Sequence, residues 1–430
     1  MDNTGDLNVT GSGVRVTDSG NIGLNVNAAG AEAGNLALAS LVNTDDGDVN
    51  LTVAGAITDE NGSGVLNVSG GALTLNANGG GIDADVEAQT QVNADSEGTI
   101  NLRSPGDLPL GLIEGVGEGE EEFYEVNLSS DGAITDTNDG DLNVRGDTVN
   151  FTANGGGIDA DVEAQTQVNA DSEGNINLRN PEGDLRVGLI NAVGDEGEEL
   201  YDVDLAASGA IVDTNGDDTN VIGNFLTLNS ENSIGDIEDF LETTVNTLSG
   251  HIAGTGDINI SNTGSLVIPN ESLTTADGDI NLVNDGDLTL GLVEANGAVN
   301  LAASSIFDSN GDLNNISATR DSLLLVDGVI GLLVNPLDVS IIGATLGVSA
   351  LNQITGVSVD INGVVSPSNT LLIIGNPPGL VILNGIDLSA IGGGFPSLGA
   401  SSLSHDLLFS PFFETIVEFF AHRRLRGFPE

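Results

Sequence analysis

The chain has 430 residues, of which 39% are hydrophobic but only 3% aromatic, and it contains no Cys and no Trp. It has 65 acidic residues and nine basic ones, all of them Arg, which gives a formal net charge of −56. Nucleic acids and anionic membranes would repel such a chain, so binding to either is not expected. The lack of Cys excludes disulfides and thiolate metal sites.

The acidic residues are spread along the chain and do not form a tail. Dense acid without Lys suits a protein that works in salt, where screening weakens self-repulsion, so we expect a marine or halophilic source. The first residues, MDNTGDLNVT, have no basic stretch followed by an apolar one, and no run of about 18 apolar residues occurs. Neither a signal peptide nor a transmembrane helix is therefore predicted.

One long segment occurs twice without change. The letters ANGGGIDADVEAQTQVNADSEG stand at 77–98 and again at 153–174. They belong to a larger repeat, because GAITD begins at Gly55 and Gly132 and GAIVD begins at Gly209. A repeat of about 77 residues, clearest at 47–230, is typical of a repeat architecture.

A shorter phrase recurs inside each repeat. Gly is followed by Asp or Asn and then by apolar, polar and apolar residues, as in GDLNV at Gly5 and GDINI at Gly256. This alternation predicts a short strand whose Leu, Ile or Val residues point inward while the middle residue points outward, with Gly and Asp or Asn in the turn. The middle residue is often Asn, at Asn8, Asn25, Asn50, Asn67, Asn101, Asn127, Asn143, Asn177, Asn259, Asn281 and Asn300.

Short strands and turns without a helical pattern continue for about 400 residues. Sandwich strands are longer and propeller blades carry aromatic signatures, so neither fold fits well. A parallel β-helix fits, because each coil buries its apolar face against the next and the verbatim segment is about one coil long. We assign 1–320 to this β-helix repeat region and expect three or four coils in each repeat.

The composition changes near Arg320. In 321–405 acidic residues become rare and Leu, Ile and Val dominate, which predicts apolar terminal coils or a β cap. In 406–430 an N-capping Ser410, Pro411 at the first helical position and a terminal Gly427 predict an amphipathic C-terminal helix. We expect this helix to cover the last coil. A basic contact with a membrane or a secretion partner is one alternative, and disorder of the segment is another.

Three longer segments continue these phrases. They are GDLTLGLVEANGAVNLAASSIFDSNGD at 286–312, NSIGDIEDFLETTVNTLSGHIAGTGDINISNTGSLVI at 232–268 and GVIGLLVNPLDVSIIGATL at 328–346. They resemble the repeat region of large bacterial exoproteins of the filamentous-haemagglutinin type. The resemblance covers most of 1–350 and lies in the recurring pattern of turn and strand residues, without an invariant motif. It implies a right-handed parallel β-helix exported by a two-partner or autotransporter-like route.

The resemblance also implies a function. Such a protein is secreted or held at the cell surface, passes an outer-membrane secretion partner, and binds a surface ligand or polysaccharide of a host or neighbouring cell. Family members begin with a signal peptide and a secretion domain that carries Asn-Pro-Asn motifs, neither of which is seen here. A fragment or a misplaced gene start is therefore expected. The family has no shared catalytic residues to carry over, so we expect a structural or adhesive module and no enzyme.

A polysaccharide hydrolase or lyase is the alternative, because β-helices also carry paired carboxylates on adjacent coils. Asn43–Asp46 and Asn215–Asp218 superficially resemble the acidic motifs of pectin-cleaving hydrolases, and Gly250–His251 adds a Gly-His pair. Their order and separations do not match that family, so we interpret them as turns. His251, His405 and His422 stand far apart, in unlike contexts. Of the Arg residues in the repeats (Arg15, Arg103, Arg145, Arg179 and Arg186), Arg103 and Arg179 occupy the same repeat position, which indicates a structural role.

Cofactor sites are not predicted. Three scattered His and no Cys do not make a zinc site, and the Gly-rich NGGGIDAD lacks the Lys and helix of a phosphate-binding loop. Acidic turns at 43–48, 137–141 and 276–279 offer oxygen ligands for calcium, but we interpret them as solvated turns. We therefore assign no catalytic, cofactor-binding or metal-binding residue.

Overall fold

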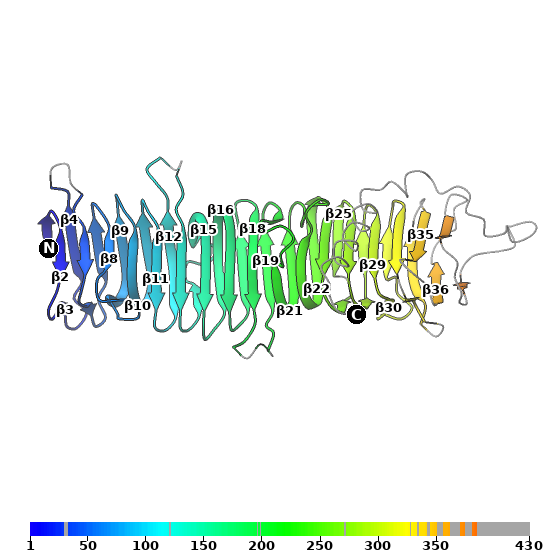
Figure 1. The fold of residues 1–430 in the computed structure, drawn as a ribbon, viewed down its shortest axis with the longest axis horizontal. Coiled ribbons are helices and arrows are strands. Elements are labelled where there is room, and N and C mark those ends of the chain that lie inside the picture. The colour runs from blue at the N-terminus through cyan, green and yellow to red at the C-terminus, as the bar shows by residue number, and fades with distance from the viewer. Residues whose placement is uncertain are drawn as a thin grey trace, which may run out of the picture. The chain divides into compact units, whose positions relative to one another are not determined.

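The computed structural model describes residues 1–29, 33–119, 122–195, 197, 199–270, 272–326, 328–332, 335–341, 345–350, 356–361, 370–374 and 381–384. Within these residues every regular element is a strand, and the strands stack in parallel as a β-solenoid of about 15 turns in all. The chain divides into unit 1 (1–209 and 221–224) and unit 2 (210–220 and 225–430). The predicted all-β parallel β-helix is confirmed (Figure 1).

The strands of unit 1 are β1 (Asp2–Thr4), β2 (Leu7–Val9), β3 (Val14–Val16), β4 (Ile22–Asn27), β5 (Leu36–Leu38), β6 (Val42–Thr44), β7 (Val49–Val53), β8 (Ile57–Asp59), β9 (Val68–Ala77), β10 (Ile82–Ser96), β11 (Ile100–Ser104), β12 (Leu108–Gly115), β13 (Val126–Ser130), β14 (Ile134–Asp136), β15 (Val144–Ala153), β16 (Ile158–Ser172), β17 (Ile176–Asn180), β18 (Leu185–Ala192) and β19 (Val203–Ala207). The residues of β21 (Val221–Ser230) fall in both units.

The strands of unit 2 are β20 (Ile211–Asp213), β22 (Leu241–Thr255), β23 (Ile258–Asn262), β24 (Leu266–Ile268), β25 (Leu273–Asp277), β26 (Ile280–Asn284), β27 (Leu288–Leu290), β28 (Val293–Ala295), β29 (Val299–Ala303), β30 (Ile306–Asp308), β31 (Ile316–Ala318), β32 (Ser322–Val326), β33 (Val329–Ile330), β34 (Leu337–Ile341), β35 (Thr345–Ala350), β36 (Gly356–Ile361), β37 (Thr370–Ile374) and β38 (Val381–Asn384).

Aliphatic residues of successive coils pair directly with one another. In unit 1 one column runs through Ile82, Ile100, Val126, Val149 and Val168, each in register with the next. In unit 2 the column of β23, β26, β29 and β32 is equally regular: Ile260 pairs with Leu282, Leu282 with Leu301, and Leu301 with Leu324. Since one coil cannot bury its own apolar face, this stacking is what builds the core.

The length of the sequence repeat is not a whole number of coils. Ile82 and Ile158 are the same residue of the verbatim segment, yet Ile158 belongs to a different column, which runs through Leu108, Ile134 and Ile176. The residue of the second copy in the column of Ile82 is Val168. One repeat therefore comprises three full coils and part of a fourth, and the two copies lie on different sides of unit 1.

Burial follows the predicted period of two. In β7, Val49, Leu51 and Val53 are fully buried while Asn50 between them is exposed. Each such aliphatic side chain contributes about 1.5–3 kcal/mol when it is buried. In β15, the larger Phe151 fits into the core because Ala170, its partner in the next coil, is small.

The expectation that the Asn residues point outward holds only in part. Asn8, Asn25 and Asn50 are exposed, but Asn67 and Asn143 are 0% exposed and Asn259 and Asn281 are also buried. Asn67 and Asn143 come directly before a strand, where their amides bind backbone groups of neighbouring coils. Asn259 and Asn281 lie in a ladder of amides on successive coils. Asn281 Nδ2 donates to Asn259 Oδ1, and Asn300 Nδ2 donates to Asn281 Oδ1.

The Gly residues of the verbatim segment allow the turns of adjacent coils to touch. A Cβ added to Gly98 would lie 2.7 Å from the backbone N of Gly81, and one added to Gly174 would lie 2.7 Å from that of Gly157. Neither distance leaves room for a side chain, so turn contacts of this closeness require Gly.

Parallel pairing continues beyond residue 320. β32 pairs with β35, β35 with β37, and β36 with β38. The helix predicted for 406–430 lies outside the described residues, as does His405. In the part of the chain that is described, no helix has the length and apolar character required to cross a bilayer.

Candidate functional site

A polar cluster recurs four times along the described part of the chain. Four short strands, β8, β14, β20 and β30, end in an Asp. An Asn follows two positions after this Asp, and a second Asn follows seven or eight positions after it. The four sets are Asp59, Asn61 and Asn67; Asp136, Asn138 and Asn143; Asp213, Asn215 and Asn220; and Asp308, Asn310 and Asn315.

The first Asn closes a tight turn on the Asp. The backbone N–H of Asn138 donates to Asp136 Oδ1 at 2.8 Å, and Asn61, Asn215 and Asn310 repeat this bond at 2.9, 2.8 and 2.7 Å. A carboxylate that accepts a bond from the backbone two residues later is a common way to stabilise a turn. The same local sequence therefore gives the same local fold in all four places.

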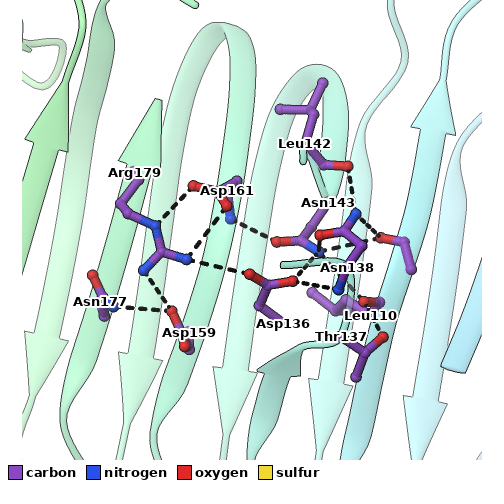
Figure 2. A network of polar contacts seen from close by, with 11 residues as sticks. Leu110, Asp136, Thr137, Asn138, Leu142, Asn143, Asp159, Asp161, Asn177 and Arg179 are labelled. Atoms are coloured by element: carbon purple, nitrogen blue, oxygen red, sulfur yellow. Dashed lines mark hydrogen bonds and ion pairs between the residues drawn. The ribbon is translucent and has the colours of Figure 1, made fainter. Parts of the chain in front are cut away.

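The second Asn connects three coils. Asn143 Nδ2 donates to Asp136 Oδ1 at 3.0 Å and to the carbonyl of Leu110 at 3.3 Å, while its Oδ1 accepts from the N–H of Asp161 at 2.7 Å (Figure 2). Asn67, Asn220 and Asn315 accept in the same way from the N–H of Asp85, Glu242 and Asp338. Each amide thus satisfies buried backbone groups that would otherwise be costly.

In the first two clusters an Arg of the next coil binds three carboxylates. Arg179 contacts Asp161 through Nε at 2.8 Å, Asp159 through Nη1 at 2.9 Å and Asp136 through Nη2 at 3.4 Å (Figure 2). Hydrogen bonding to Asp161 is the main cause that raises the pKa of Arg179 above its usual value. The guanidinium thereby neutralises much of the charge at this corner.

Arg103 makes the same contacts in the first cluster. It binds Asp85 at 2.9 Å, Asp83 at 2.6 Å and Asp59 at 3.3 Å. Burial lowers the pKa of Arg103, but hydrogen bonds to Asp85 and Asp83 outweigh that effect and raise it. This confirms that Arg103 and Arg179 occupy the same position of the repeat.

The third cluster keeps the Asp–Asn framework but has no Arg at this position. Glu242 takes the place of Asp161, and the residue paired with it in the next coil is Ser261. Asp213 is only 7% exposed. Among the described residues, neither Asp213 Oδ2 nor Glu242 Oε2 has a hydrogen-bond partner, although both atoms are buried.

In this cluster, which has no Arg, two carboxyl groups have raised pKa values. Desolvation, followed by the charges of Asp213 and Asp239, raises the pKa of Glu242 to about 8. Desolvation and the nearby Asp213 raise the pKa of Asp239 to about 6. Burial without a counter-charge favours the protonated form of a carboxyl group in this way.

The other residues considered from sequence are placed as follows. Asp45 and Asp46 lie on an exposed turn of unit 1, where Asp45 pairs with Arg15 at 3.5 Å. Asp217 and Asp218 lie on the exposed turn after β20 in unit 2, and His251 Nδ1 lies 2.8 Å from Thr274 Oγ1 on the neighbouring strand.

Arg145 binds Glu163 at 3.0 Å and lies 5.3 Å from the centre of the Phe123 ring. Of the acidic turns that we interpret as solvated, those at 43–48 and 137–141 lie in unit 1 and that at 276–279 lies in unit 2. Within the described ranges, no group of three or more Asp, Glu or His is arranged to hold a metal ion.

Sequence reasoning missed the cluster itself. Its signal was the recurring Asp-x-Asn spacing before a second Asn, and, in the third copy, the loss of the Arg found in the first two. Comparison of the chain with protein-family models, curated proteins and solved structures gave no match.

Proposed function

We propose that the chain is a structural or adhesive repeat module of a secreted or cell-surface bacterial exoprotein of the filamentous-haemagglutinin type, without enzymatic activity. The observation that carries the proposal is a parallel solenoid in which the same segment is built twice, as β10 and β16. Such a scaffold presents the same surface at two fixed positions of one rigid stack.

The repeated surface includes an apolar residue. Leu112 and Leu189 occupy equivalent positions and are 38% and 43% exposed. Their backbone N–H groups donate to Asn93 Oδ1 and Asn169 Oδ1 at 3.0 and 2.9 Å, so the two corners share one local geometry. Because the two copies of the repeat lie on different sides of unit 1, the scaffold suits contacts with two partners, as in surface assembly.

A binding experiment tests this function. The full chain is applied to an array of neutral polysaccharides and to intact bacterial and epithelial cells, together with Leu112→Asp, Leu189→Asp and the double variant. Each single variant should lose binding at one corner and keep it at the other, while the double variant should lose binding at both. Val65→Asp is the matched control, because Val65 is 51% exposed and lies outside both corners.

The alternative function, a polysaccharide-active enzyme, has one observation in its favour. A carboxyl group whose pKa is raised to about 8, as for Glu242, has the acidity required of a general acid near neutral pH. An assay for newly released reducing ends on the same polysaccharides distinguishes the two functions. Product release that disappears in Glu242→Gln would replace the adhesive proposal with the enzymatic one.

A further inference from the structure

The first three carboxylate clusters differ in how their negative charge is balanced. In the first two, one guanidinium contacts three carboxylates. In the third, Ser261 stands where Arg103 and Arg179 stand, and Glu242 has replaced the shorter Asp. The framework that holds the acids in place is nevertheless kept, because Asn220 still donates to Asp213 at 2.5 Å and accepts from Glu242 at 2.8 Å.

Every charged group that acts on this cluster is acidic. Asp213 comes from β20, Asp217 from the turn after it, Asp236 and Asp239 from the segment before β22, and Glu242 from β22. From β23, the residue facing Glu242 is the neutral Ser261. Within the part of the chain that is described, no basic side chain is among the charges that act on Glu242 or Asp239.

Two observations indicate what balances these charges. Asp213 raises the pKa of Asp239 through its charge and through a side-chain hydrogen bond, and two carboxyl groups can form such a bond only if one carries a proton. Asp213 Oδ2 and Glu242 Oε2 are also buried without a partner, and a buried ionised oxygen is costly unless it is neutralised. No group of three acids in the described residues is arranged as a metal site, which favours protons over a metal ion.

We propose that the third cluster is a proton-operated lock, in which protons on Glu242 and Asp239 take the place of the guanidinium found in the first two clusters. When the protons leave, the acids repel one another and the local structure of unit 2 around β20, 231–240 and the start of β22 opens. The lock is independent of the adhesive role proposed above.

The direction of the pH effect follows from the raised pKa of Glu242. The pKa of Glu242 is about 8 in the folded chain, against an ordinary value of 4.5. Between these values the folded state binds more protons than the unfolded state, so stability falls as the pH rises. The stabilising effect is fully present below about pH 4.5 and is lost as the pH rises through about 8.

Hydrogen–deuterium exchange of the full chain, resolved to peptides and corrected for the intrinsic exchange rate, tests the lock. From about pH 6 to about pH 8, amides in 211–243 should lose about tenfold or more of their protection. Amides in 134–161, where Arg179 supplies the positive charge, should change little and serve as the internal control. Equal pH profiles in both regions would overturn the proposal.

Two variants and one added ion sharpen the test. Glu242→Gln and, separately, Asp239→Asn should reduce the loss of protection at high pH, whereas Asp218→Asn, which removes an exposed acid of the same turn, should not. An unchanged profile in both Glu242→Gln and Asp239→Asn would contradict the lock. Restored protection near pH 8 on adding millimolar calcium at constant ionic strength would show that a metal ion, and not a proton, balances the cluster.

Discussion

At the scale of single residues, Arg103 and Arg179 each bind three carboxylates, an arrangement that we call an Arg cage. Each Arg cage should contribute more to stability than a surface ion pair. Arg179→Ala would leave Asp136, Asp159 and Asp161 without their shared cation. Breaking a buried pair costs about 3–5 kcal/mol, and because the Arg179 side chain is 31% exposed we expect about 2 kcal/mol. Urea unfolding followed by circular dichroism measures this loss.

Arg15→Ala is the matched control for that prediction. Arg15 pairs with Asp45 in the same unit, but the two side chains are 66% and 45% exposed. Exposed pairs contribute about 0.2–1 kcal/mol, so this variant should stay close to the parent. Similar losses from Arg179→Ala and Arg15→Ala would mean that the cage adds nothing beyond an ordinary surface pair.

A buried Asn of the cluster gives a second prediction. In Asn143→Asp the donors to Asp136 and Leu110 are lost, and a carboxylate is placed against the Asp136 carboxylate. Unsatisfied buried groups cost about 1–3 kcal/mol each, so we expect a loss of about 3 kcal/mol or more in urea unfolding. Asn50→Asp makes the same chemical change at an exposed position, and there the loss should stay within about 0.5 kcal/mol.

At the scale of elements, period-two patterns predicted the strands well. The Gly-Asp or Gly-Asn turn followed by alternating residues placed β7, β17, β23 and β26 correctly, because the inward residues of such short strands must be aliphatic for coils to stack. The pattern failed for Asn67 and Asn143. These look like outward-facing strand residues in the sequence, but each precedes its strand and turns inward to bind backbone groups.

Register between coils could not be read from the sequence. Loops of different length separate the strands, so a repeat of about 77 residues does not fix which residues of successive coils pair. The cluster was missed for the same reason: Asp136, Asp161 and Arg179 belong to three different strands and meet only when the coils stack. The structural role of Arg103 and Arg179 could be predicted from the sequence because both residues occupy the same position of the repeat.

At the scale of the whole molecule, the net charge of −56 should make stability depend on salt. Equivalent residues of neighbouring coils lie about 4.8 Å apart in a parallel stack. The Debye length is about 10 Å at 0.1 M salt and about 3 Å at 1 M, so repulsion between neighbouring coils is still weakly screened at ordinary ionic strength. The free energy of unfolding should therefore keep rising between about 0.1 and 1 M KCl, where long-range repulsion alone would already have been screened.

Urea unfolding of the full chain at several KCl concentrations measures this dependence. A neutral osmolyte at equal osmolality is the control, since it strengthens burial without screening charge. A free energy of unfolding that levels off near 0.1 M, or an equal gain with the osmolyte, would mean that repulsion between adjacent coils does not limit stability. Salt screens surface acids throughout the chain, whereas the protons of the third cluster act at one corner of unit 2. High salt should therefore leave most of the pH-dependent opening of 211–243 in place, because buried charges are screened much less than exposed ones.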